Sequence, residues 1–252
     1  MKKALLLALI VPVASFASCQ GGEGAGATKA SLIAALEINV GKQFQCRFQA
    51  YSTEVRDGFR ISSHENGEHL FLESKTSCTY FVVEPSEFEP EFVFFESLEN
   101  EVQHSTHYFP DEWKCNKFRV QGSIGFPNLF PSKRGGGLCS QAIDLLKEMS
   151  GGDVQVKGVR ALISWSNNSQ ISEEDWERVE LEVDLEQGVP VSFVKSYQDG
   201  RSMEFAFEDF DFFSGGYLEK KASLAANLSL PADFTCKCVA DELVERLPGV
   251  LR

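Results

Sequence analysis

The sequence predicts an α+β protein built on a mainly antiparallel, curved β-sheet with two or three covering helices. Three observations lead to this fold class. The second half of the chain contains three segments in which apolar and polar residues alternate, separated by two strong turns. The first half contains further strand-like segments punctuated by proline. Two segments with helical spacing of apolar residues lie at 28–39 and 140–149.

The alternation in the second half predicts a three-stranded antiparallel meander. Residues 179–186 alternate Val or Leu with Glu or Asp, and 189–197 continue on a second strand. Gln187-Gly188 and Asp199-Gly200 supply the turns, because glycine accepts the positive φ that tight hairpins require. A third strand returns through Met203, Phe205 and Phe207. One face of this meander is apolar, so it must be buried against helices or against the rest of the sheet.

The first half predicts several more strands. Residues 43–50 alternate as a half-buried strand, and 58–73 are interpreted as a hairpin with Asn66-Gly67 as its two-residue turn. Three further strands are expected at 77–84, 91–98 and 113–120. The Gly- and Pro-rich segment 122–137 predicts a loop, which separates possible halves 28–137 and 138–252 of a single domain, 28–252.

Residues 1–18 have the pattern of an export signal. Lys2 and Lys3 precede an apolar run, and small residues follow it. The run is shorter than the roughly 20 residues that span a bilayer. Cleavage before Cys19 would make this cysteine the acylated N-terminus of a lipoprotein, with 19–27 as a flexible Gly/Ala-rich tether. Cleavage after Ala17 would instead give ordinary secretion. The expected location is the periplasm or the outer membrane, or alternatively outside the cell.

Six cysteines remain once Cys19 is assigned to lipid. An even number suits disulfide bonds in an oxidising compartment, and the sequence does not choose among the pairings. The alternative is that several of them are buried thiols. The disulfide candidates are Cys46, Cys78, Cys115, Cys139, Cys236 and Cys238.

The net charge of the chain limits the classes of binding partner that we expect. The chain has a formal charge of −13, which becomes −15 when Lys2 and Lys3 leave with the signal. Such an acidic body disfavours nucleic acid, which attracts stripes of Lys and Arg. The expected partners are a membrane, through the lipid anchor, and a hydrophobic ligand or an envelope protein. The sequence contains no Walker, Rossmann or nucleophile-elbow motif and predicts no cofactor.

The meander and the segment that follows it resemble the LolA/LolB type of periplasmic lipoprotein carrier. The matching features are the Gly188-x-Pro190 turn, the Asp199-Gly200 turn, and Leu230-Pro231-x-x-Phe234. The resemblance covers about 60 residues near the C-terminus. It implies a half-barrel of antiparallel strands with helices in its mouth and a hydrophobic cavity between them. The part of the chain before the meander departs from this pattern, because its four cysteines, Cys46, Cys78, Cys115 and Cys139, are unusual for such carriers.

Phenylalanine is abundant, with 21 in 252 residues. A cavity for a hydrophobic ligand needs apolar side chains that face inward, whereas the same residues could simply fill a core. The candidate ligand-binding residues are Phe92, Phe94, Phe95, Phe193, Phe205 and Phe207.

The segment His64 to His69 suggests one metal hypothesis. If Asn66-Gly67 is a turn, His64 and His69 face each other across a hairpin and could hold a metal ion, with His104 and His107 from another strand as further candidate ligands. The alternative is a solvent-exposed polar tip.

The sequence therefore predicts an exported, lipid-anchored, non-catalytic protein that binds a hydrophobic ligand or a partner protein on a concave sheet face. The first alternative is a secreted or surface structural module with a filled core and disulfides. The second is an extracellular hydrolase whose active-site residues are scattered along the sequence.

Overall fold

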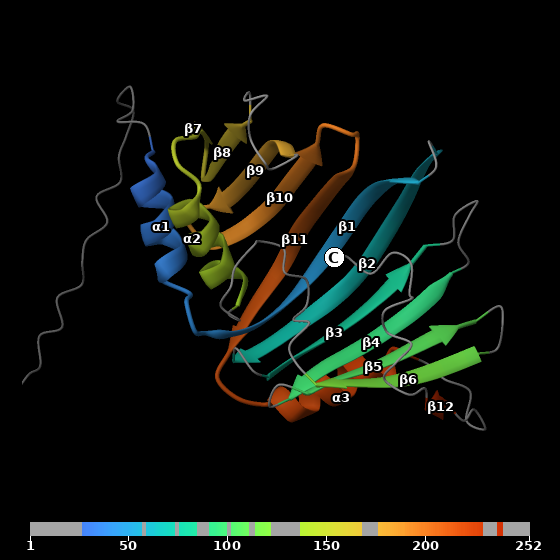
Figure 1. Cartoon of the computed structure of the whole chain (residues 1–252). Helices are drawn as coiled ribbons and strands as arrows, with labels where there is room; N and C mark the ends of the chain where they lie inside the picture. The colour runs from blue at the N-terminus through green and yellow to red at the C-terminus, as the bar shows by residue number, and fades with distance from the viewer. Residues whose placement is uncertain are drawn as a thin grey trace, which may run out of the picture.

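The computed structural model describes residues 27–56, 59–73, 76–84, 91–99, 102–110, 114–121, 137–167, 176–228 and 236–238. Its architecture is one strongly twisted sheet with helices on both faces (Figure 1). The predicted α+β class is confirmed, because all neighbouring strands pair antiparallel except the two-residue strand β12, which pairs parallel with β6. The sheet does not close: β7 and β12 form its two edges.

The strand order is β12-β6-β5-β4-β3-β2-β1-β11-β10-β9-β8-β7. The first half of the chain supplies β1 (Gln43–Arg56), β2 (Phe59–Glu73), β3 (Thr76–Val83), β4 (Phe92–Glu99), β5 (Val102–Phe109) and β6 (Lys114–Gln121). The second half supplies β7 (Asp153–Lys157), β8 (Arg160–Ser166), β9 (Trp176–Asp184), β10 (Val189–Tyr197), β11 (Ser202–Phe213) and β12 (Lys237–Cys238). Strands β1 and β11 pair, so one sheet joins the two halves of the chain.

The predicted meander is confirmed as β9, β10 and β11, with turns at Gly188 and Gly200. The predicted hairpin at 58–73 is wrong, because β2 runs straight through Asn66 and Gly67. Gly67 lies opposite Phe48 on β1 and Phe81 on β3. A Cβ atom at Gly67 would lie 2.7 Å from Phe48 Cζ and 2.6 Å from Phe81 Cβ. The glycine therefore makes room inside the sheet for aromatic rings rather than turning the chain.

Helices α1 (Lys29–Glu37) and α2 (Leu138–Glu148) cover one face of the sheet at its β7–β11 end (Figure 1). We call this face, which carries Phe44, Cys46 and Phe48 of β1, the inner face. Thr28 caps α1 through its side chain, which accepts a hydrogen bond from the Ser31 N–H. The apolar side of α2 and the inner-face residues of β8–β11 form one continuous core that includes Leu146, Ile163, Trp165, Leu181, Val183, Phe193 and Phe205.

The turn between β9 and β10 holds α1 against the sheet. Gly188 has a φ of +68°, and a Cβ atom there would lie 2.4 Å from the carbonyl oxygen of Ala35. The Asn39 side-chain amide donates to the carbonyl oxygens of Gln187, at 2.6 Å, and of Gly188, at 3.0 Å. Only glycine fits this close approach of helix and turn.

Helix α3 (Tyr217–Ala226) packs on the opposite, outer face, against β2 and β3. A second, smaller core joins it to the sheet through Leu70, Cys78, Tyr217 and Leu224. The three described helices satisfy the prediction of two or three covering helices. None of them is long and apolar enough to cross a bilayer.

Candidate functional site

The inner face continues beyond α1 and α2 onto β2–β5 as a mainly aromatic surface. We call this region the aromatic face; it comprises Phe71, Phe81, Val83, Phe92, Phe94, Leu98 and His107, all of which are buried except the partly exposed Phe81 and Phe92. The strand register places the rings side by side, because each inner-face residue lies directly opposite an inner-face residue of the neighbouring strand. In Figure 1, α1 and α2 lie over the β7–β11 end, while β3–β6 extend away from them.

A ladder of rings runs across the strands of the aromatic face. Phe81 and Phe94 stack with centroids 4.6 Å apart, and His107 meets Phe94 edge-on at 4.0 Å. Phe48 continues the ladder onto β1, with its ring 6.3 Å from that of Phe81. Phe92 lies beside Phe94 at 4.7 Å. Paired rings at these separations attract one another beyond their burial, so the ladder is a cohesive apolar strip perpendicular to the strands.

A row of polar side chains lies next to this ladder on the same face. The His69 ring and the Thr79 hydroxyl form a hydrogen bond of 2.9 Å between β2 and β3. On the next two strands, the Ser105 hydroxyl donates to the Glu96 carboxylate at 3.1 Å. His69, Thr79 and Ser105 are all buried. The inner face at β2–β5 therefore combines the rings of the aromatic face with buried hydrogen-bonding groups beside them, which is the composition of many ligand sites.

Both inner-face histidines are held neutral. Burial lowers the pKa of His69 to about 3, because the imidazolium loses its hydration in the protein interior. The same cause lowers the pKa of His107 to about 3. The aromatic face thus carries no positive charge from these two residues at neutral pH.

The six predicted phenylalanines do not form one site. Phe92 and Phe94 lie on the aromatic face. Phe95, their neighbour on β4, points to the outer face and packs against the core under α3. The other three, Phe193, Phe205 and Phe207, lie in the core beneath α1 and α2, where each is at most 4% exposed.

The cysteine prediction holds for one pair. Cys115 on β6 and Cys236, next to β12, form a disulfide that closes a separation of 121 residues. Cys46, Cys78 and Cys139 are buried thiols, which corrects the prediction for these three. Burial raises the pKa of the Cys139 thiol to about 12 and that of Cys46 further, so neither is a reactive thiolate. Cys19 and the side chain of Cys238 lie outside the described residues.

The histidine metal hypothesis is wrong in its geometry. His64 and His69 belong to one continuous strand and are five residues apart, so they point to opposite faces. His64 stacks on Tyr51, with centroids 4.1 Å apart, and its Nδ1 lies 2.8 Å from a Glu84 carboxylate oxygen. Among the described residues no group of three or more His, Cys, Asp or Glu could hold a metal ion.

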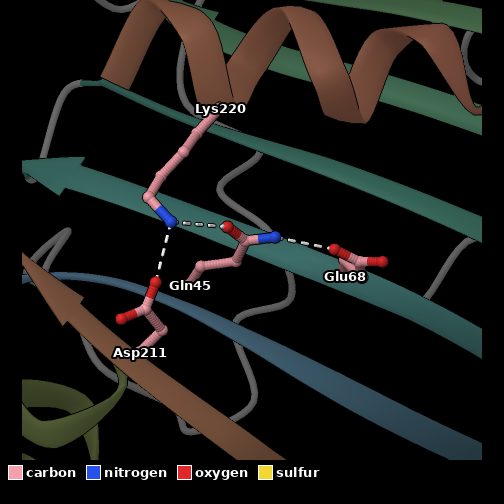
Figure 2. Close-up of polar contacts among 4 residues, drawn as sticks. All are labelled: Gln45, Glu68, Asp211 and Lys220. Atoms are coloured by element: carbon pink, nitrogen blue, oxygen red, sulfur yellow. Dashed lines mark hydrogen bonds and ion pairs between the residues drawn. The ribbon is translucent and has the colours of Figure 1, made fainter. Parts of the chain in front are cut away.

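A polar pocket of about 250 Å³ lies on the outer face, where a β-bulge interrupts the pairing of β1 with β11. Each of its charged side chains already has a polar partner. Arg47 forms ion pairs with Glu208 and Asp209. Figure 2 shows the Lys220 ammonium of α3 donating to Asp211 at 2.7 Å and to Gln45 at 3.3 Å, while the Gln45 amide donates to Glu68 at 2.7 Å. This network braces α3 against the sheet, and we assign it a structural role.

No protein-family model matches the chain, and no curated protein sequence matches it. Solved structures are similar to it over most of their length. A LolA superfamily protein from Nitrosomonas europaea has 8% identity and a TM-score of 0.31, covering 75% of this chain and 96% of that one. A DUF1329 family protein from Desulfovibrio piger has 12% identity and a TM-score of 0.32, covering 75% and 93%.

A third solved structure, described as an outer membrane lipoprotein-sorting protein domain from Vibrio parahaemolyticus, has 7% identity and a TM-score of 0.30, covering 78% of this chain and 98% of that one. The descriptions of two of these structures name the type of protein that the meander resembles. The closing Leu-Pro-x-x-Phe segment of that resemblance lies outside the described residues. At such low identities and TM-scores the likeness carries no inference about a ligand or an activity.

Sequence reasoning did not assign five members of the aromatic face to a ligand site: Phe71, Phe81, Val83, Leu98 and His107. Phe71 and Phe81 were within predicted strand segments, but the false turn at Gly67 hid which residues share a face. His107 belongs to β5, whose sequence Val-Gln-His-Ser-Thr-His-Tyr-Phe has no apolar alternation. The signal that could have revealed β5 is the run of strand-compatible residues at 102–109, between the strands predicted at 91–98 and 113–120.

Proposed function

We propose that this chain is an exported protein that binds the hydrocarbon chain of a lipid along the aromatic face. Residues 1–18 act as the export signal, Cys19 carries the lipid anchor, and 20–27 form the tether. The observation that supports ligand binding best is the ring ladder from Phe48 to His107, which extends the inner face past the helices that cover its other end.

The dimensions of the ladder suit an extended acyl chain. Neighbouring strands are about 4.8 Å apart, so the step from β1 to β5 is about 19 Å. This is comparable with the length of an extended fatty acyl chain. Such a chain would lie across the strands on the rings of Phe48, Phe81 and Phe94. The proposal rests on these residues and not on the likeness to solved structures.

One alternative, a structural module with a filled core, is supported by a specific observation. Phe94 is only 4% exposed and Val83 only 2% exposed. Side chains buried to this degree also suit a structural module whose core is filled. The two proposals differ in whether an added hydrophobic ligand binds to the aromatic face.

Two adjacent residues of β4 provide a matched test. Phe94→Ala removes a ring from the aromatic face, and Phe95→Ala removes one from the outer face. We expect Phe94→Ala to weaken binding of a fluorescent long-chain fatty acid at least tenfold, because a ring on the proposed path is lost. Phe95→Ala should bind within about twofold of wild type. Urea unfolding of both variants checks that each remains folded.

Equal binding by the two folded variants, or no binding by the wild-type protein, would contradict the proposed ligand site. The anchor is tested separately by the intact mass of the exported protein. Acyl chains should be present on the wild type and absent from Cys19→Ser. A wild-type protein that begins at Ser18 without lipid would overturn the anchor and leave ligand binding to be decided by the Phe94 and Phe95 variants.

A further inference from the structure

Exposed apolar side chains gather at one corner of the molecule. Of the seven large hydrophobic residues that are exposed in the described part of the chain, four belong to this corner. We call it the apolar corner; its members are Ile38 (59% exposed), Val40 (46%), Val156 (46%) and Val159 (48%). Scattered exposed residues need no explanation, but a cluster of them marks an interaction surface.

Two hydrogen bonds to one turn, one from the backbone and one from a side chain, bring together segments from two distant parts of the sequence. Ile38 and Val40 follow α1, whereas Val156 and Val159 belong to β7 and the turn after it. The turn between β9 and β10 links the two pairs. Its Leu185 N–H donates to the Val159 carbonyl oxygen at 2.8 Å, and its Gln187 carbonyl oxygen accepts from Asn39.

The charge around the apolar corner differs from that of the whole chain. Charged residues of both signs lie close to these four residues in the sequence or in the strand pairing: Lys42, Lys157, Arg160, Glu37, Asp184, Glu182 and Glu186. Arg160 and Glu182 lie 3.8 Å apart. These seven residues have a net charge of 3 − 4 = −1, whereas the chain as a whole has a charge of −13. An apolar surface with so little net charge can approach anionic lipid with less repulsion than the acidic remainder would meet.

The position of the proposed anchor favours a bilayer as the occupant. Residues 20–28 lie between Cys19 and α1, and nine residues span at most about 30 Å. Helix α1 has nine residues and is about 14 Å long, so its far end, where Ile38 lies, is within reach of the same membrane. A short tether also raises the effective concentration of the corner at the lipid surface to the millimolar range.

We infer that the apolar corner docks on the surface of the membrane that holds the lipid anchor. This inference goes beyond ligand binding and depends on the proposed function only through the anchor. Ile38, Val40, Val156 and Val159 enter the boundary between headgroups and acyl chains, and the three basic side chains meet lipid phosphates. Docking fixes the orientation of the sheet relative to the bilayer.

The test uses the mature chain with a histidine tag in place of the acyl anchor, bound to nickel-chelating vesicles of phosphatidylethanolamine and phosphatidylglycerol. Amide hydrogen exchange is compared on vesicles and in solution. We expect exchange at residues 38–42 and 155–160 to slow at least threefold on vesicles. Val156→Asp combined with Val159→Asp should abolish the slowing, because the new carboxylates resist burial.

Leu218→Asp is the matched control. Leu218 is 74% exposed and therefore more accessible than any member of the corner, but it lies on α3 at the outer face. This variant should retain the slowing in full. Unchanged exchange at the corner of the tethered wild type would overturn the inference, as would equal effects of the Val and Leu218 variants. Slowing that depends on protein concentration without vesicles would assign the corner to a second copy of the chain and also overturn it.

Discussion

At the β8–β11 end of the sheet, the inner face lies under α1 and α2 and is packed with mixed aliphatic and aromatic side chains such as Leu181, Val183 and Phe193. At the β2–β5 end, the same face carries rings stacked on one another and buried polar groups that bond across strands. Helix α3 does not cover this second region, because it packs on the outer face.

The contrast shows how the two ends of one continuous sheet can have different roles. Helices that bury an aliphatic surface make a rigid core, since every side chain has fixed neighbours. A surface of stacked rings interrupted by hydrogen-bonding residues keeps internal cohesion of its own, and it offers both apolar and polar contacts to a ligand. We therefore expect substitutions at the helix-covered end to change stability, and those on the aromatic face to change ligand binding as well.

The largest expected effect is at the helix-covered end. Phe193→Ala should lower the free energy of unfolding by about 3–5 kcal/mol, because Phe193 is 1% exposed and its removal leaves a cavity. Phe193→Leu should cost less than about 1.5 kcal/mol. Urea unfolding measures both. A loss below about 1 kcal/mol for Phe193→Ala would show that this end is not tightly packed.

The second-largest expected effect is at Gly67, which leaves room for the rings of Phe48 and Phe81. Gly67→Ala places a Cβ atom 2.3 Å from the Tyr80 carbonyl oxygen, so β2 and β3 must move apart. We expect a loss of about 2–3 kcal/mol in the free energy of unfolding. Gly215→Ala is the control, because nothing lies within 4 Å of a Cβ atom there. If the two variants are equally stable, the close packing of Phe48 and Phe81 around Gly67 is not real.

A smaller effect comes from the buried histidines. Their pKa is about 3 in the folded protein and near 6.5 when unfolded, so the unfolded state binds more protons between these values. Stability from each neutral histidine is fully present above about pH 6.5 and is lost progressively down to about pH 3. From pH 7 to pH 5 each should contribute a loss of about 2 kcal/mol.

His107→Leu isolates this contribution. The variant should lose about 2 kcal/mol less than wild type between pH 7 and pH 5, measured by urea unfolding at each pH. His104→Leu serves as the control, because His104 is exposed on the outer face of the same strand. Parallel pH profiles for wild type and His107→Leu would mean that His107 is accessible to water.

Much of the fold was predictable because local patterns and tertiary structure agree there. The alternation at 179–207 and the glycines at 188 and 200 specified the meander, and the apolar spacing at 140–149 specified α2. The exception at Asn66-Gly67 has a physical cause. The pair that favours a tight turn also occurs where a side chain must be absent, and only the rings of Phe48 and Phe81 distinguish the two cases.

The candidate site was less predictable. Phe92 and Phe94 could be found from composition, but the sequence alone did not show that Phe95 faces α3 or that Phe193 lies beneath the other helices. Pairing of Cys115 with Cys236 depends on a contact over 121 residues, which no local pattern encodes. Helix α3 and strands β5, β7, β8 and β12 were not predicted. Helix α3 and β5 have no strong apolar periodicity, and β7 and β12 have five residues or fewer.

The most direct test of the central claim is to locate a bound lipid by NMR. Backbone amide shifts of the mature protein are recorded with and without a long-chain fatty acid. Lipid binding to the aromatic face predicts that the largest changes fall on β3, β4 and β5, at residues such as Phe81, Phe94 and His107, while β8–β10 remain unchanged. Changes centred on β8–β10 or on α3, or no changes at saturating fatty acid, would contradict it.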